Sequence, residues 1–165
     1  GAGSAGCRDG LHVTMHAMIR FELDGITVEH EVPPASSALE VLRDLCGNTA
    51  VKPACRIGRC GACMILLDGH PVNACLVLAA RLDGRRVVTA AGLRADAEAR
   101  TIRTVFAEEG ALQCGYCTPG LVVSLTAALR AGGRLAELEA AAQAHLCRCT
   151  GYGGLRRALS RLAER

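Results

Sequence analysis

The sequence predicts an α+β protein in which a small β-rich domain precedes a small four-helix domain. Two observations carry this prediction: the first half alternates apolar and polar residues, and the second half has apolar stripes at helical spacing. Of the 165 residues, 50% are hydrophobic and 21% charged, a composition typical of folded domains rather than disordered chains. We place the domains at residues 18–92 and 93–165, after an arm or processing remnant at residues 1–17.

The first two predicted elements form a hairpin. Residues 18–24 and 26–32 each alternate between apolar and polar side chains, as half-buried strands do. Asp24 and Gly25 join them, and an Asp-Gly pair between alternating runs is a strong signal for a two-residue turn.

A short helix is predicted next. Ser37 and Glu40 have the spacing of a capping box, in which the two residues cap each other's amides. We expect the helix to end near Gly47, because glycine adopts the left-handed conformation that closes many helices. Its predicted apolar face consists of Leu39, Leu42 and Leu45.

The rest of the first half is predicted to be a loop followed by short strands. Residues 48–63 form the loop, and the apolar residues 64–67 form a buried strand. A turn at Asp68-Gly69 leads into a strand over residues 71–75. Residues 86–90 are predicted to be the last strand.

Four helices are predicted in the second half. The first ends at Glu109-Gly110, and the second begins with Thr118 as N-cap and Pro119 at the first helical position. The third covers residues 135–144. The apolar faces of the first, second and fourth helices are Ile102, Val105 and Phe106; Leu121, Leu125, Ala128 and Leu129; and Leu155, Leu159 and Leu162.

Eight of the ten cysteines form two compact groups, whereas Cys7 and Cys46 stand apart. The first group is Cys55, Cys60, Cys63 and Cys75. The second group is Cys114, Cys117, Cys147 and Cys149. Closely spaced cysteine pairs hold their thiolates near one point, which suits a metal site better than a long-range disulfide.

The spacing of the first three cysteines matches that of plant-type [2Fe–2S] ferredoxins. Gly58 and Gly61 permit the tight backbone turns of such a loop, and Arg56 and Arg59 add positive charge beside an anionic cluster. A four-cysteine zinc site is the alternative. The second group lies at two predicted helix starts, which favour anions, but its spacing suits either zinc or iron–sulfur.

Two segments of the second half resemble the iron–sulfur subunit of molybdenum hydroxylases, the family of xanthine dehydrogenase and aldehyde oxidoreductase. Residues 112–120 read LQCGYCTPG and residues 146–152 read LCRCTGY. Residues 60–63 (CGAC) and 66–69 (LLDG) are also similar to that family. The resemblance extends over nearly the whole chain, from about Met18 onward.

The resemblance implies a β-grasp, plant-type ferredoxin-like domain with one [2Fe–2S] cluster, followed by a four-helix domain with the second. It further implies a large molybdopterin-binding subunit and a medium FAD-binding subunit as partners. Electrons would pass from molybdenum through both clusters to FAD, with the second cysteine group nearer molybdenum and the first nearer the flavin. Gln113 and Cys149 match positions that lie against the pterin cofactor.

One segment departs from the family pattern. The family loop usually reads Cys-Gly-Glu-Gly, whereas this chain has Cys55-Arg56-Ile57-Gly58. The added positive charge would raise the potential of the first cluster or meet an acidic surface on the flavin subunit.

Two other classes of protein stay open at this point. A free-standing ferredoxin with two clusters would carry the same cysteines, and a structural zinc-binding interaction module is the alternative of another class. The net charge of +3 and the four aromatic residues do not favour nucleic acid as a partner. No apolar run reaches the roughly 20 residues of a membrane span.

The remaining polar residues suggest no substrate site, so the chain is expected to be a non-catalytic part of an oxidoreductase. The five histidines form no ligand set and are expected at the surface or in turns. Arg156, Arg157 and Arg161 are expected to form a solvated basic helix face or a docking surface for the large subunit. Reduced thiols favour the cytoplasm, with export after removal of a leader as the alternative.

Overall fold

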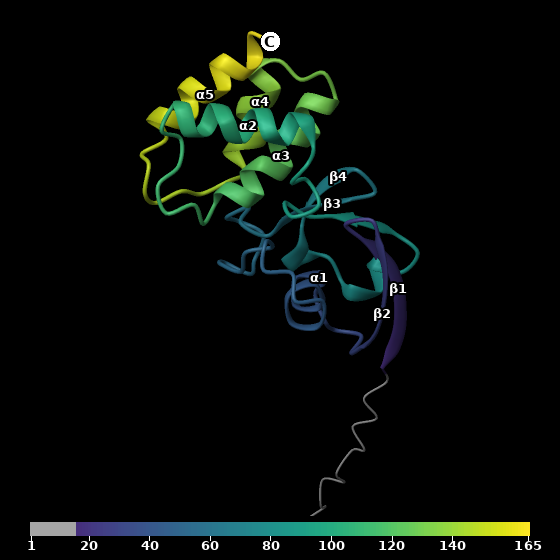
Figure 1. The fold of residues 1–165 in the computed structure, drawn as a ribbon. Coiled ribbons are helices and arrows are strands. Elements are labelled where there is room, and N and C mark those ends of the chain that lie inside the picture. The colour runs from purple at the N-terminus through teal and green to yellow at the C-terminus, as the bar shows by residue number, and fades with distance from the viewer. Residues whose placement is uncertain (1–15) are drawn as a thin grey trace, which may run out of the picture.

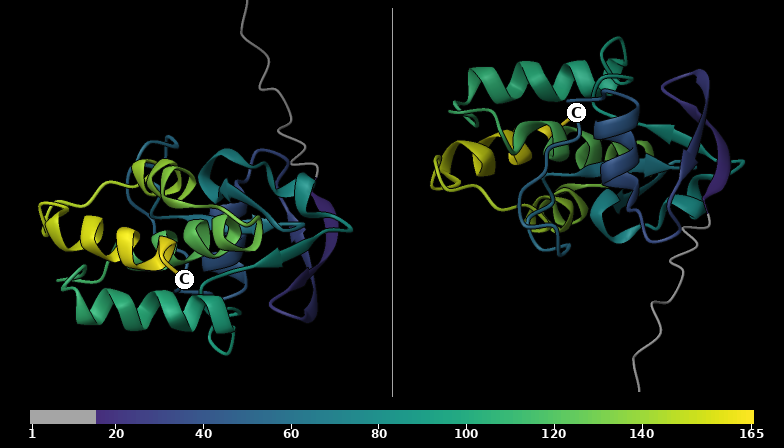
Figure 2. Two further views of the ribbon diagram at one scale, coloured as in Figure 1. Left: turned by 90° about the horizontal axis from the view of Figure 1, so that it is seen from above. Right: turned by 90° about the horizontal axis from the view of Figure 1, so that it is seen from below.

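The computed structural model describes residues 16–165 and contains a mixed five-stranded sheet and a group of helices (Figure 1). The predicted arm at residues 1–17 lies almost wholly outside the described residues, as do Cys7 and His12. Seen from above and below, the sheet occupies one half of the molecule and most helices the other (Figure 2). The predicted α+β class is therefore correct.

The sheet has the strand order β2-β1-β5-β3-β4. Its strands are β1 (Ala17–Leu23), β2 (Ile26–Val32), β3 (Met64–Leu67), β4 (His70–Asn73) and β5 (Arg86–Val88). β1 and β5 are parallel, and the other neighbours are antiparallel. Both predicted Asp-Gly turns are present, and all four of their residues have positive φ, as the twist of a tight hairpin requires.

The predicted capping box begins the helical segment between β2 and β3. Ser37 Oγ accepts a hydrogen bond from the Glu40 amide, and Glu40 Oε2 accepts one from the Ser37 amide at 2.7 Å. After α1 (Ala38–Glu40) the winding widens into the π-helical turn η1 (Val41–Leu45), which the spacing did not predict. The wider winding turns Leu45 away from the core, so this leucine is exposed, contrary to the prediction.

The helices after the sheet agree with the predicted positions to within a few residues. They are α2 (Ala97–Glu108), α3 (Thr118–Arg130), α4 (Leu135–Gln143) and α5 (Gly153–Ala163). One start differs from its prediction: Cys117 occupies the N-cap of α3, and Thr118 is already helical. Cys117 itself has αR backbone angles, so the chain enters this helix one residue early.

Strand β3 contributes to two hydrophobic cores. Met64 and Leu66 pack among the helices, on a core that includes Phe106 and Leu125. Ile65 points to the opposite face, into the core of the sheet half. Because successive strand residues face opposite sides, one short strand joins the two halves, and α3 packs directly on it.

Candidate metal centres

The first cysteine group is assembled by a loop and a hairpin. Cys55, Cys60 and Cys63 lie in the loop before β3, and Cys75 lies in the 3₁₀ turn η2 (Ala74–Leu76) after β4. The β3–β4 pairing places the end of β4 opposite the start of β3, and the Ala74 amide donates to the Cys63 carbonyl at 3.2 Å. Cys75 therefore lies beside Cys63, although the β3–β4 hairpin separates the two along the chain.

The loop curls because several of its residues adopt left-handed backbone angles. Arg56, Gly58 and Gly61 all have positive φ, and the two glycines were predicted to have this role. At Gly58 a Cβ would overlap with the exposed Leu76 side chain, so a substitution there would have to move that side chain in addition to adopting a positive φ. The curl turns the Arg59 amide toward the Cys55 sulfur, to which it donates at 3.3 Å.

The thiols of this group differ in acidity. The Ile57 amide donates to the Cys55 sulfur and lowers the pKa of that thiol to about 7. Burial raises the pKa of Cys63 to about 12. Asn73 supports the arrangement, because its amide nitrogen donates to the Gly58 carbonyl at 3.2 Å while its carbonyl oxygen lies 3.9 Å from the Cys63 sulfur.

The second cysteine group is assembled by two inter-helix segments. Cys114 and Cys117 lie between α2 and α3, and Cys147 and Cys149 lie between α4 and α5. The sulfur atoms of Cys114 and Cys149 are 3.5 Å apart, and the Cys117 thiol lies beside that of Cys147. The segment 147–152 is tied by its own hydrogen bonds, including one of 2.7 Å from the Cys147 amide to the Tyr152 hydroxyl.

This group also contains one thiol with a lowered pKa and one with a raised pKa. Burial works to raise the pKa of Cys147, but the Thr150 hydroxyl at 3.3 Å and nearby amides lower it to about 7. Burial raises the pKa of Cys117 to about 12. At the exposed Cys149 the neighbouring Cys114 thiol raises the pKa.

In each group the directly contacting thiols form two pairs, and weaker charge interactions connect one pair to the other. The pairs are Cys55 with Cys60, Cys63 with Cys75, Cys114 with Cys149, and Cys117 with Cys147. Within residues 16–165, no three His, Cys, Asp or Glu side chains are arranged to hold a single metal ion. Two pairs around one centre are the donor set that two bridged irons need. Bound cations would also stabilise the thiolate forms of Cys63 and Cys117, which burial disfavours.

The chain segments that carry the two groups are in direct contact with each other. The Leu146 amide donates to the Cys60 carbonyl at 3.1 Å. His145 is only 2% exposed, and its Nε2 lies 2.7 Å from Ser124 Oγ on α3. Burial lowers the pKa of His145 to about 4. The prediction of a surface or turn position for this histidine was wrong. Its burial against Ser124 arises from tertiary packing between segments that are distant in the sequence.

The two groups differ in their access to solvent. Cys60 and Cys63 are buried, whereas Cys114, Cys149 and the neighbouring Gln113 are exposed. The second group therefore has an open edge formed by Cys114, Cys149 and Gln113. Arg56 and Arg59 are exposed beside the first group, together with the apolar side chain of Ile57.

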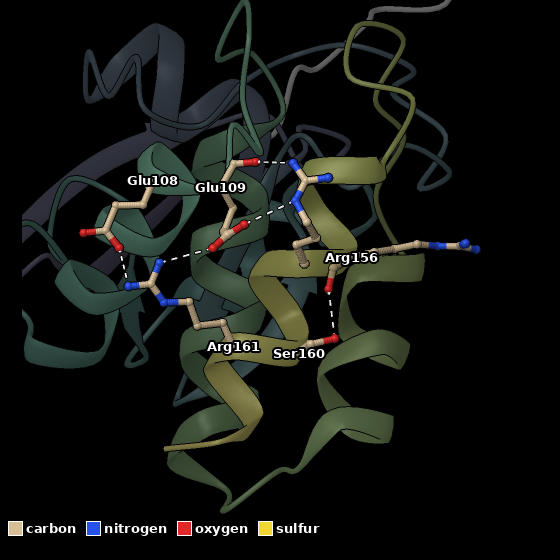
Figure 3. Close-up of polar contacts among 6 residues, drawn as sticks. Glu108, Glu109, Arg156, Ser160 and Arg161 are labelled. Atoms are coloured by element: carbon tan, nitrogen blue, oxygen red, sulfur yellow. Dashed lines mark hydrogen bonds and ion pairs between the residues drawn. The ribbon is translucent and has the colours of Figure 1, made fainter.

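The predicted basic face on α5 is largely neutralised within the chain (Figure 3). Arg157 pairs with Glu109, and Arg161 pairs with both Glu108 and Glu109. Arg156 points away from these carboxylates and is exposed. The sequence spacing on one helix could not reveal acidic partners at the end of another.

Comparisons with known proteins agree with the geometry of both groups. Residues 21–90 match a family model described as 2Fe-2S iron-sulfur cluster binding domain, and residues 89–160 match one described as [2Fe-2S] binding domain. The chain is 40% identical over 145 residues to a probable xanthine dehydrogenase subunit of Bacillus subtilis (strain 168). That alignment covers 87% of this chain and 83% of the relative.

Two further similarities cover almost the same part of the chain. The nicotinate dehydrogenase small FeS subunit of Eubacterium barkeri is 36% identical over 149 residues, which cover 89% of this chain and 95% of that protein. A chain of quinoline 2-oxidoreductase from Pseudomonas putida 86 has a similar structure, with a TM-score of 0.81 and 31% identity. The match covers 90% of this chain and 94% of that one. No helix within residues 16–165 is both long and apolar enough to cross a membrane.

Proposed function

Because this chain belongs to the family of iron–sulfur subunits of molybdenum hydroxylases, we propose that it carries electrons from a molybdopterin centre on a large subunit to FAD on a medium subunit. It is the electron-transfer subunit of an oxidoreductase complex, and the oxidation of substrate takes place elsewhere in that complex. The observation that carries the details is the two-by-two arrangement of its eight thiols.

Each thiol pair is proposed to hold one iron. Cys55 and Cys60 would hold one iron of the first cluster, and Cys63 and Cys75 the other. In the second cluster the iron pairs would be Cys114 with Cys149, and Cys117 with Cys147. A [2Fe–2S] cluster supplies one-electron chemistry when bound. The chain holds the thiolates in place and directs amides at sulfur, as the Arg59 and Ile57 amides do at Cys55.

The proposed domains are a β-grasp, ferredoxin-like unit at residues 18–92 and a four-helix unit at residues 93–165. The strand order and the parallel β1–β5 pair support the first assignment. Each unit has fewer than 100 residues, a size at which a bound metal centre contributes substantially to stability. Cluster assembly requires reduced thiols, so we propose that the protein is located in the cytoplasm.

The open edge of the second group is the basis for proposing which cysteine group faces which partner subunit. Cys114, Cys149 and Gln113 are exposed, and they are proposed to face the pterin on the large subunit. Gln113 offers both a donor and an acceptor, and the Cys149 sulfur can accept a hydrogen bond. The first group, with Arg56, Arg59 and Ile57 exposed beside it, would face the flavin subunit.

The test is to purify the complex through a tag on this chain and to count its components. We expect four irons and four sulfides per chain, a red-brown colour, two distinct EPR signals after reduction, and co-purifying molybdenum and FAD. A colourless protein that contains zinc would support the interaction module instead. A stable protein with both clusters but without larger partners would support the free-standing ferredoxin.

A further inference from the structure

One backbone hydrogen bond connects the two cysteine groups. The Leu146 amide donates to the carbonyl of Cys60, with nitrogen and oxygen 3.1 Å apart. Cys60 belongs to the first group, and Leu146 is bonded directly to Cys147 of the second. From the Cys60 sulfur to the Cys147 sulfur, the path along the chain therefore contains a single non-covalent step.

The packing around this hydrogen bond leaves no room for a side chain at either of two glycines, Gly61 and Gly120. At Gly61 a Cβ would overlap with His145 Nδ1 and with the Ala144 carbonyl. At Gly120, near the start of α3, a Cβ would overlap with the Gly61 carbonyl. Three segments thus meet backbone to backbone. His145 fills the space between them and is fastened to α3 through Ser124.

The Leu146 side chain takes no part in this contact. It is 60% exposed, although leucine is usually buried. The junction is therefore formed by main-chain atoms, which fix the separation of the cysteine groups more firmly than flexible side chains would. Cys60, which supplies the acceptor, is buried, and a buried polar group is costly to leave without a partner.

We propose that the hydrogen bond from the Leu146 amide to the Cys60 carbonyl, held closed by Gly61, Gly120 and His145, is the contact that couples the two clusters electronically. This proposal rests on the proposed function. The centre held by Cys147 loses one electron as the centre held by Cys60 gains one, and no bond is made or broken. In this scheme Leu146 and His145 are positioning residues and touch no substrate.

The direct test removes only the Leu146 N–H. Replacing this residue by its α-hydroxy analogue in the full chain converts the amide into an ester and keeps the side chain. The control is the same replacement at Leu112, a partly exposed leucine whose amide donates no hydrogen bond within residues 16–165. The readouts are iron content, the magnetic interaction between the reduced clusters by EPR, and the rate of electron exchange between clusters after pulse radiolysis.

The Leu146 ester should retain four irons but exchange electrons between its clusters more slowly than the unmodified chain, because the hydrogen-bonded step of the path becomes a through-space gap. Its EPR splitting should weaken, whereas the Leu112 ester should match the unmodified chain. If a Leu146 ester that holds both clusters shows an unchanged EPR splitting and an unchanged rate of electron exchange, this inference is overturned. The proposed function would not be affected by that result. An unmodified chain that lacks two clusters would instead overturn the proposed function.

A second variant opens the same junction from the other side. Gly120→Ala places a methyl group against the Gly61 carbonyl, whereas Gly153→Ala, at the start of α5, meets only the end of the Arg157 side chain at 3.9 Å. We expect Gly120→Ala to weaken the coupling with both clusters retained and Gly153→Ala to leave it unchanged. Equal coupling in the two variants would contradict the proposal. If Gly120→Ala fails to fold, the ester decides.

Discussion

The two cysteine groups of this chain use the same number of thiols in opposite surroundings. The first group lies in a curled loop against the sheet, with Cys60 and Cys63 buried. The second lies between helix ends, with Cys114 and Cys149 exposed. Yet each combines a thiol whose pKa is about 7 with one whose pKa burial raises to about 12. The comparison shows that the two groups offer similar sets of thiols, whereas the fold around each group determines how exposed those thiols are to solvent.

The largest expected effect comes from removing one proposed ligand from each group. Cys60→Ser and Cys117→Ser should each lose about two of the four irons, because each cluster contains two irons. The EPR signal of the other group should persist, which would show that the groups load separately. Loss of both signals in either variant would mean that the two centres cannot be compared as independent sites.

The open edge of the second group is tested by Gln113→Ala in the assembled complex. Both clusters should remain, but reduction of the clusters by substrate should slow about tenfold to hundredfold, because a lost hydrogen bond to a buried partner costs about 1–3 kcal/mol. Stopped-flow absorbance measures this rate. Gln143→Ala, another exposed glutamine, is the matched control. If Gln113→Ala keeps the normal rate and holds its pterin, Gln113 is not at the contact.

The comparison extends to the carboxylates that begin a helix in each half. Asp96 caps α2 through the Ala99 amide at 2.9 Å and pairs with Arg130, whereas Glu40 in the capping box of α1 is more exposed. Asp96→Ala should cost about 1–2 kcal/mol of unfolding free energy, and Glu40→Gln only a few tenths. Chemical denaturation followed by circular dichroism would measure both, and equal costs would contradict the comparison.

The pH dependence of Asp96 follows from the direction of its pKa. Despite burial, the Ala99 amide and the Arg130 guanidinium lower the pKa of Asp96 in the folded state below 3.8. Its contribution to stability is therefore fully present above the unfolded value and is lost as pH falls through the folded pKa. The difference between the native chain and Asp96→Ala should shrink over that acidic range.

The smallest expected effect on iron content concerns a cysteine outside both groups. Cys46 is half-buried, and burial raises its pKa. Cys46→Ser should leave the iron content unchanged and cost about 1 kcal/mol, the penalty for placing a hydroxyl in a partly apolar site. Cys7 lies outside the described residues, and Cys7→Ser should also leave the iron content unchanged. Iron loss in Cys46→Ser would mean that the first group is wrongly assigned.

Local patterns predicted much of this fold, because their causes lie within a few residues. The Asp24-Gly25 turn and the Ser37 capping box were predicted by the chemistry of adjacent groups. The apolar stripe of α5 was predicted in the same way, and its three leucines are buried. In the site, Gly58 and Gly61 were predicted to adopt the turns that they do adopt.

The features that sequence reasoning missed depend on contacts between distant segments. His145 is buried because the first cysteine loop and α3 close around it. Arg157 and Arg161 find acidic partners at the end of α2, which no spacing within α5 reveals. Leu45 is exposed because one helical turn widens, and this small change in winding left no signal in the apolar pattern.

The position of β3 between two cores has a consequence for how the protein can be divided. Cutting the chain between β5 and α2 would expose the apolar side chains of Met64 and Leu66 on the first piece. On the second piece, α3 would lose the strand β3 against which it packs. Neither piece would be expected to persist alone. We therefore expect the two halves to fold together, which limits where this polypeptide can be split, permuted or joined to another.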